Sequence, residues 1–207
     1  MGKVAEFRGC DHLSIAEITA DDNSTGGGSY TTGTVINLCE VAQITKNTEQ
    51  SSKVLFYDNK AQDTVDGVGA DTVTLIVPAL VLSALAKITG ADIDQTTGAY
   101  IDRGNNNKKK YYALGYRLKL TDGTYRYVWK LKGKFTNTPD ESADTESNDI
   151  NTSNQTVQFT AIDTIHEFEN GGAARSVYCD ERDGLAVLTD WFNGVKTPDD
   201  LPSAKTN

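Results

Sequence analysis

The chain has 207 residues, of which 38% are hydrophobic, so it can bury a sizeable core and suits one domain spanning 1–207. Its formal net charge is -9, and its three cysteines (Cys10, Cys39, Cys179) are odd in number and far apart, which predicts free thiols in a reducing compartment and argues against a disulfide framework. The N-terminal MGKVAEFRGC lacks an apolar h-region, and the most apolar run, Val73–Ala86, is too short for a bilayer, so we expect no signal peptide, no membrane anchor and synthesis in a cytoplasm.

The first 71 residues alternate between strand patterns and polar loops. His12–Thr19 predicts a strand, and Asp21–Gly33, which is rich in Gly, Ser and Thr, predicts a flexible loop. Thr34–Thr45 and Lys53–Tyr57 are further strand candidates. Asp58–Asp71 (DNKAQDTVDGVGAD) reads as a polar loop, and loops of this length in compact domains are usually functional or disordered.

The next segment predicts a strand followed by the main helix. Thr72–Val77 is a strand pattern that runs into Pro78, and proline is favoured in the first turn of a helix. Ala79–Thr89 is apolar on nearly every side and predicts a well-buried helix, with Gly90 as its left-handed C-terminal cap.

Tyr111–Phe135 (YYALGYRLKLTDGTYRYVWKLKGKF) predicts a long antiparallel hairpin around Asp122-Gly123, because both turn residues tolerate the positive φ of a type I′ turn. In that register all apolar side chains share one face, with four facing pairs: Leu120 with Tyr125, Leu118 with Tyr127, Tyr116 with Trp129, and Leu114 with Leu131. The opposite face collects Arg117, Lys119, Arg126, Lys130, Lys132 and Lys134.

This basic face contrasts with acidic flanks. Residues 103–134 carry a net charge of +9, whereas 1–102 carry -8 and 136–207 carry -10. Three interpretations stay open: a solvated face, a nucleic-acid patch, or a dock for an acidic surface on a neighbouring copy. Base-stacking platforms interleave aromatic and cationic side chains on one face, whereas the register predicted here separates them.

The C-terminal third begins with Thr136–Gln155, a polar and acidic segment that predicts a loop or an arm. Thr156–Glu169 predicts a strand, and Asp183 is placed to cap a short C-terminal helix that ends at Asn193-Gly194. Residues 196–207 form a polar tail. The predicted fold is therefore mainly β, an antiparallel β-sandwich or split barrel with one packed α-helix and a short C-terminal helix.

Signals for chemistry are weak. His12 and His166 are far apart, and Gly67-x-Gly69 lacks the third glycine and the helix of a dinucleotide fingerprint. The run from Asp92 begins like a calcium loop but places Arg103 where the bidentate Glu belongs. We expect no catalytic residue, no metal site and no cofactor, and we do not expect an enzyme.

The hairpin YYALGYRLKL–DG–YRYVWKLKGKF, followed by a proline and acidic residues, resembles the major tail protein, the tail tube subunit, of long-tailed siphovirus-type bacteriophages. Other segments resemble the family in the same order along the chain. They are HLSIAEIT, KVLFYDNKAQDTVDGVG, the apolar strand and helix that end at Gly90, and Thr189–Phe192. The likeness covers roughly Ala5 to Val195.

The resemblance implies a fold shared with contractile-tail and type VI secretion tube proteins. It also implies hexameric rings that stack into a hollow tube, through which double-stranded DNA passes without specific binding. Implied partners are other copies of the chain, a tape measure protein, a tail terminator and distal tail proteins, and the implied location is the virion.

Within that expectation, the six hairpin cations are candidates for the subunit interface. The candidates for an inter-ring loop are Asp58, Lys60, Asp63, Asp66 and Asp71, and those for lumen-facing acids are Asp140, Glu141, Asp144, Glu146 and Asp149. Two alternatives remain, a monomeric β-sandwich module that binds carbohydrate or peptide, and a nucleic-acid-binding protein that uses the basic hairpin.

Overall fold

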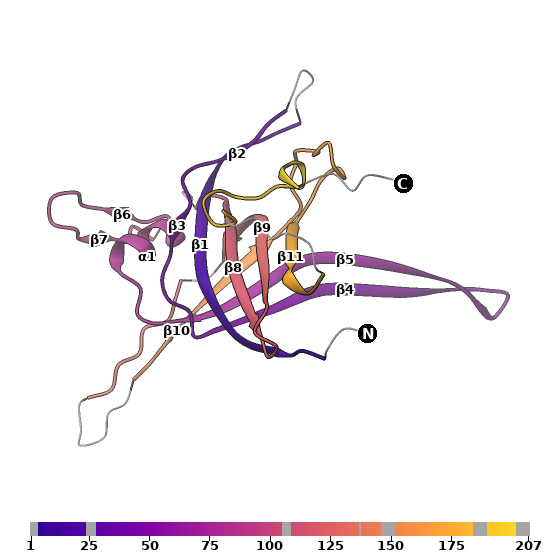
Figure 1. The fold of residues 1–207 in the computed structure, drawn as a ribbon, viewed down its shortest axis with the longest axis horizontal. Coiled ribbons are helices and arrows are strands. Elements are labelled where there is room, and N and C mark those ends of the chain that lie inside the picture. The colour runs from indigo at the N-terminus through magenta and orange to yellow at the C-terminus, as the bar shows by residue number, and fades with distance from the viewer. Residues whose placement is uncertain are drawn as a thin grey trace.

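The computed structural model describes residues 4–23, 28–104, 109–136, 138–145, 152–183 and 190–201. Strands hold 51% of the structure and helices 8%, and every strand pairing is antiparallel, which confirms the predicted mainly β class. The elements in order are β1 (Phe7–Asp21), β2 (Tyr30–Thr32), β3 (Ile36–Asn37), β4 (Gln43–Tyr57), β5 (Lys60–Val77), α1 (Leu82–Thr89), β6 (Asp92–Ile93), β7 (Tyr100–Ile101), β8 (Tyr112–Leu120), β9 (Tyr125–Phe135), β10 (Gln155–Ala161) and β11 (Ser176–Asp180) (Figure 1). Short 3₁₀ turns lie at Glu181–Asp183 and Pro198–Asp200.

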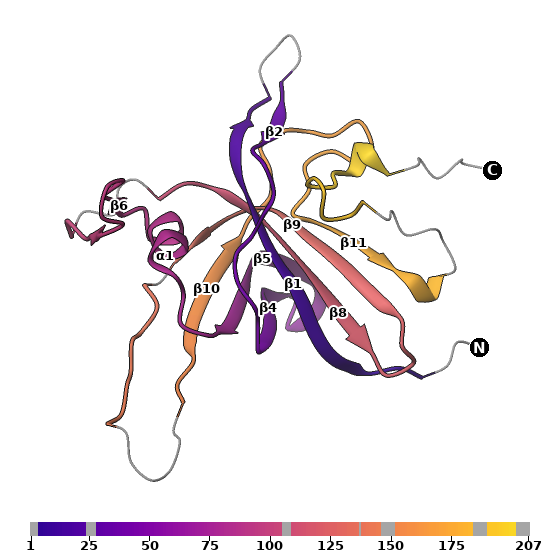
Figure 2. The same ribbon diagram turned by 60° about the vertical axis from the view of Figure 1, so that its left-hand side comes forward.

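The main sheet runs in the order β2-β1-β8-β9-β10-β5-β4, with β3 paired to β1 and β11 paired to β9. One edge of β9 is shared, because residues 126–130 pair with β11 and residues 133–135 pair with β10. The described strands form no closed barrel, so the sandwich or split-barrel detail stays a prediction. Figure 2 shows the strands fanning out from a crowded crossing region rather than lying in two flat layers.

The β8–β9 hairpin forms as predicted, but its predicted register is wrong by one residue. The loop has three residues, Thr121 to Gly123: the Gly123 N–H donates to the Leu120 carbonyl (3.1 Å) and the Leu120 N–H to the Thr124 carbonyl (2.9 Å). Gly123 has φ +91°, as expected where a type I turn is followed by a left-handed residue. The Asp122 carboxylate accepts hydrogen bonds from the Thr124 N–H (3.0 Å) and hydroxyl (2.6 Å), which favours this turn over the tighter two-residue one.

The register change places apolar residues on both faces of the hairpin. Tyr116 faces Val128 instead of Trp129, so Trp129 points to the opposite side of the sheet. One buried cluster joins Leu114 and Tyr116 to the other strands and to α1. A second cluster, which includes Trp129, Leu131 and Trp191, lies on the other face, and residues 191–201 help to cover it. Neither face of this hairpin is a basic surface.

Segment 58–71, predicted to be a loop, is a strand. Only Asp58 and Asn59 form the turn, with φ +48° and +61°, and β5 then pairs with β4 from Lys60 onwards. Main-chain hydrogen bonds make this pairing without requiring apolar side chains, so the Asp- and Gly-rich composition concealed it. Beyond the core, β4 and β5 continue as a long hairpin that extends past the other described elements (Figure 1).

The remaining expectations are met in part. α1 begins at Leu82, three residues later than predicted, with Val81 as N-cap, whereas Gly90 is left-handed (φ +76°) as expected. The strand predicted at 34–45 is reduced to β3 and the start of β4, and β10 ends at Ala161. Most of the predicted C-terminal helix falls at 184–189, outside the described residues, and 190–194 is a turn.

Candidate functional site

The six hairpin cations do not share one exposed face. The Lys130 and Lys132 side chains are buried, and Arg117 and Arg126 bind carboxylates of this same chain, Asp11 and Asp180, both at 2.7 Å. Lys119 and Lys134 lie over tyrosine rings. The expectation of a continuous basic face was wrong, because the observed register places Arg117 and Lys119 on the opposite side of the sheet from Arg126 and Lys130. Carboxylates on other strands are the counter-ions of four of the six cations, Arg117, Arg126, Lys130 and Lys132.

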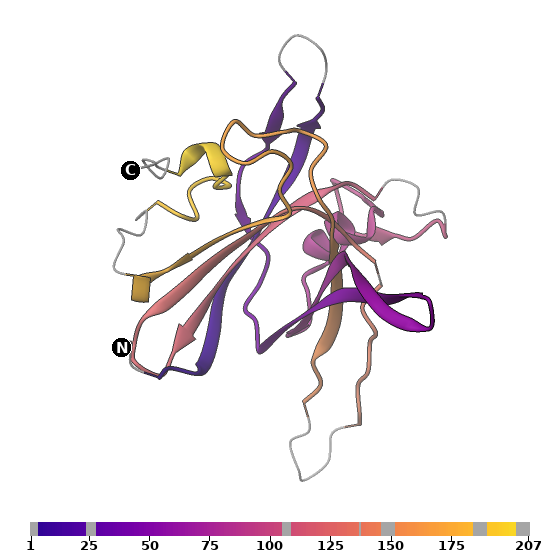
Figure 3. The ribbon, with the colours of Figure 1, turned by 90° about the vertical axis from the view of Figure 1, so that its right-hand side faces the viewer.

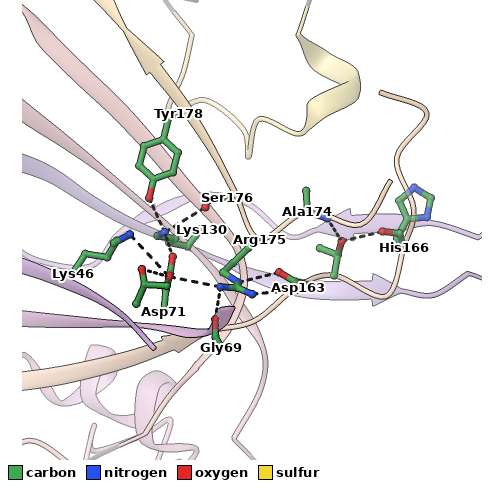
Figure 4. A network of polar contacts seen from close by, with 12 residues as sticks. Lys46, Gly69, Asp71, Lys130, Asp163, His166, Ala174, Arg175, Ser176 and Tyr178 are labelled. Atoms are coloured by element: carbon green, nitrogen blue, oxygen red, sulfur yellow. Dashed lines mark hydrogen bonds and ion pairs between the residues drawn. The ribbon is translucent and has the colours of Figure 1, made fainter. Parts of the chain in front are cut away.

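The most buried of these cations anchors the base of the β4–β5 hairpin (Figure 4). Lys130 Nζ on β9 lies 2.5 Å from Asp71 Oδ2 on β5 and donates to the Tyr178 hydroxyl on β11 at 2.7 Å. The Thr48 hydroxyl on β4 donates to the second Asp71 oxygen at 2.7 Å. Charge attraction and hydrogen bonds therefore tie four strands together around the Lys130–Asp71 pair, which compensates the desolvation of the two buried ions.

Arg175 extends this anchor to the segment before β11. Its guanidinium lies 3.7 Å from Asp71 Oδ1, donates to the Gly69 carbonyl, and binds Asp163 Oδ1 at 2.9 Å (Figure 4). Lys46 Nζ approaches Asp71 Oδ1 from β4, at 4.0 Å. Hairpin strands β4 and β5 therefore leave the body of the protein through a fixed base.

The pKa values of three largely buried carboxyl groups make the stability of this fold depend on pH. Burial acts to raise the pKa of Asp71, but hydrogen bonds from Lys130 and Thr48 outweigh it and the pKa is lowered. Burial also acts to raise the pKa of Asp21, but Lys132 and the His166 and Ile165 amides together lower it. Hydrogen bonds from Arg182 and Arg126 hold the pKa of Asp180 well below its usual range.

Carboxyl groups with a depressed pKa in the folded state stabilise the protein above their unfolded pKa, about 3.9, and this stabilisation is lost as pH falls through the folded values. We therefore expect the urea midpoint to be nearly constant from about pH 7 to pH 5 and to fall below about pH 4. Equilibrium unfolding followed by tryptophan fluorescence measures this. A midpoint that rises on acidification through pH 4 would contradict the assignment of these carboxylates.

Beyond the anchor, residues 49–70 form what we call the arm. At about 3.3 Å per residue, the part of β4 in the arm, Glu49 to Tyr57, is roughly 30 Å long. The described chain covers neither face of the arm: Phe56 is 66% exposed and Val68 65% exposed, and the side chains of Val54, Val65 and Tyr57 are also exposed. Figure 3, which views the molecule from the side toward which the arm points, shows the arm standing apart from the β8–β9 hairpin.

The arm also has two free strand edges. β4 is the last strand of the sheet, and β5 pairs with β10 only between Asp71 and Val77. From Lys60 to Ala70, therefore, the second edge of β5 has no strand partner among the described residues. A two-stranded hairpin is marginal in water without a covering layer, and unpaired edges are templates for another chain.

Four of the five candidates for the inter-ring loop lie on the arm: Asp58, Lys60, Asp63 and Asp66 are exposed there. Asp71 was wrongly placed with them, because it is buried in the anchor. Among the lumen candidates Asp140, Glu141 and Asp144 are exposed in the described segment 138–145, whereas Glu146 and Asp149 lie outside the described residues.

Sequence reasoning missed the apolar side chains of the arm. Phe56 and Tyr57 carry a clear strand signal in KVLFY, but that signal predicts a half-buried strand and not an exposed one. Val65 and Val68 were hidden within the supposed loop. The exposed ends of β4 and β5 emerge only when their pairing is known.

Nothing in the described part of the chain gathers three His, Cys, Asp or Glu side chains into a metal-binding group. His12 stacks on Phe192, with ring centroids 5.0 Å apart. The three cysteines are free, and burial raises the pKa of each thiol, that of Cys39 to about 11, so little reactive thiolate forms at neutral pH. No helix in the described ranges is both long and apolar enough to cross a bilayer.

The chain matches no protein-family model and no curated protein.

Proposed function

We propose that this protein is a structural subunit that self-assembles into stacked hexameric rings, and that these form the tail tube of a long-tailed bacteriophage, the conduit for genome delivery. The observation that carries the self-assembly is the arm, whose side chains are mostly exposed on both faces and whose two edges have no strand partner among the described residues. The ring number, the DNA conduit and the virion location come from the sequence resemblance alone.

Edge pairing supplies a physical route to a ring. The free edge of β4 in one copy can pair with the free arm edge of β5 in the next, which is a heterologous contact, since two different surfaces meet. Repeated rotation about one axis closes such contacts into a ring. Pairing satisfies the free backbone groups of both edges and sets exposed apolar side chains of the two arms side by side as cross-strand neighbours, and the apolar area that they remove from water contributes to association.

The buried anchor supports the same proposal. An arm that must meet another copy in a fixed direction benefits from a rigid base, because ordering a mobile segment on binding lowers affinity. Lys130, Asp71 and Arg175 provide that base inside the monomer. They leave the hairpin without the exposed basic face on which the nucleic-acid alternative depends.

Shortening the arm tests the proposal. In the register observed, Ser51 pairs with Gly67, so residues 52–66 can be replaced by Asn-Gly, which favours a two-residue type I′ turn. We expect the full-length protein to form rings or tubes when concentrated, seen by negative-stain electron microscopy and light scattering, and the shortened variant to remain a folded monomer. Circular dichroism confirms that the body is intact.

Two outcomes count against the proposal. A shortened variant that still builds normal tubes removes the arm from assembly. A full-length protein that stays monomeric at high concentration, with or without DNA, overturns self-assembly and favours the monomeric binding module. Salt-dependent DNA affinity without assembly instead favours the nucleic-acid alternative.

A further inference from the structure

We infer that the groove between β1 and β4 is the receptor for the arm of a second copy. The groove has a volume of about 780 Å³ and lies where the sheet fails to close, between residues 7–10 of β1 and residues 42–46 beside and within β4. This inference rests on the proposed self-assembly and adds a second contact to it: edge pairing joins neighbouring arms within a ring, and the groove receives the arm tip of a copy in the next ring.

The groove is basic and apolar. Three cationic side chains line it, those of Arg8, Lys46 and Arg126, and the described residues that line it include no carboxylate. Carboxylates behind the wall partly neutralise two of them, since Arg126 binds Asp180 at 2.7 Å and Lys46 lies 4.0 Å from Asp71, whereas Arg8 has no ion-pair partner among the described residues. Arg126 holds its guanidinium over the Phe7 ring, 5.2 Å from the centroid. Phe7 and Tyr178 are exposed there, so the wall offers aromatic surface as well as positive charge.

The arm has the complementary composition. It carries four acidic residues (Glu49, Asp58, Asp63, Asp66) and two lysines, Lys53 and Lys60, a net charge of -2. Its exposed side chains include Val54, Phe56, Val65 and Val68. An acidic and apolar projection therefore meets a basic and apolar groove, and opposite potentials guide such an encounter and fix its register.

Geometry excludes an intramolecular match. The groove lies at the base of the arm, since Lys46 of β4 lines it, and the arm runs roughly 30 Å away from that base. Its tip can fill only the groove of another molecule. Because a tip meets a base, each contact displaces the next copy along the arm, and a heterologous contact of this kind repeats into a stack.

The other acidic segment fits less well. Residues 138–145 carry Asp140, Glu141 and Asp144 but expose no large apolar side chain. They could neutralise the groove cations, but they would leave Phe7 and Tyr178 uncovered. The arm provides both components.

Disulfide trapping tests the inference with two full-length variants. The groove variant keeps Cys10, which lines the groove, and carries Cys39→Ser and Cys179→Ser. The arm variant carries Ala61→Cys, opposite Phe56 in the register, together with Cys10→Ser, Cys39→Ser and Cys179→Ser. The two are mixed, concentrated and oxidised with diamide, and the covalent dimer is measured on a non-reducing gel.

We expect a covalent dimer in which Cys10 of the groove variant is joined to the thiol that Ala61→Cys introduces on the arm variant. Ile101→Cys in place of Ala61→Cys is the matched control, because Ile101 is also exposed but lies on β7, at the opposite end of the molecule from the arm (Figure 1), and it should give no dimer. Arg8→Glu in the groove variant should lower the yield several-fold, whereas Lys87→Glu on α1 should not.

The outcomes separate this inference from the proposed function. Tubes that form while the groove and Ala61→Cys variants give no covalent dimer overturn the groove as receptor and leave self-assembly standing. A product with Glu141→Cys but not with Ala61→Cys assigns the groove to segment 138–145 and also overturns the inference. If Cys10 fails to react with a small thiol reagent in the free subunit, Gln43→Cys, exposed in the same groove, replaces it.

Discussion

Replacing Asp71 with Asn is expected to lower the free energy of unfolding by about 3–5 kcal/mol, because it leaves the Lys130 ammonium buried without a counter-charge. Lys130 is 0% exposed, so water cannot substitute for the lost carboxylate. Urea denaturation at neutral pH measures the change. A loss below about 1 kcal/mol would show that the pair is not desolvated in solution.

Two further variants test whether the loss in Asp71→Asn comes from the unpaired buried charge of Lys130. Asp163→Asn removes a carboxylate that is 57% exposed and binds Arg175 at 2.9 Å, and it should cost less than about 1 kcal/mol. Asp71→Leu combined with Lys130→Met removes both charges and should recover most of the stability, since a buried pair replaced by apolar side chains is often neutral. Because the double variant leaves the arm sequence unchanged, its ability to assemble also shows whether the charges of Asp71 and Lys130 are needed for assembly.

Gly133→Ala is expected to destabilise the protein by about 2–3 kcal/mol through overpacking between β9 and β10. A β-carbon at Gly133 would fall far inside contact distance of the Phe159 ring and of the Thr160 carbonyl oxygen. The carbonyl belongs to the backbone, so β9 and β10 would have to separate and weaken the ladder that joins Phe135 to Phe159. Thermal unfolding followed by circular dichroism reports the loss.

Gly9→Ala is the matched control for this substitution. Its β-carbon would meet only the Lys119 β-carbon, at an ordinary 3.9 Å, so we expect little change in stability. Equal losses in both variants would mean that strand glycines here act through backbone freedom alone, and the packing explanation would fail.

The sequence determined the elements whose signals are local. The hairpin at Tyr112–Phe135, the apolar strand before Pro78 and the Gly90 cap could each be predicted, because turn chemistry, side-chain alternation and the left-handed preference of glycine act over a few residues. The register of that hairpin could not be predicted, since it depended on the Asp122 side chain binding Thr124, and one residue of slip exchanged the faces of β9.

The candidate site was predictable only in outline. Segment 58–71 was predicted as the inter-ring loop because it is long and polar. Its strand character depends on main-chain pairing with β4, which amino-acid composition hardly indicates. The burial of Lys130 and the role of Asp71 required partners 59 residues apart in sequence to meet. The sequence by itself therefore determined a β-rich chain with an unusual basic hairpin, because those properties are local. Only the tertiary structure decided which charges are neutralised internally and which surface is left bare, because both depend on contacts between distant strands.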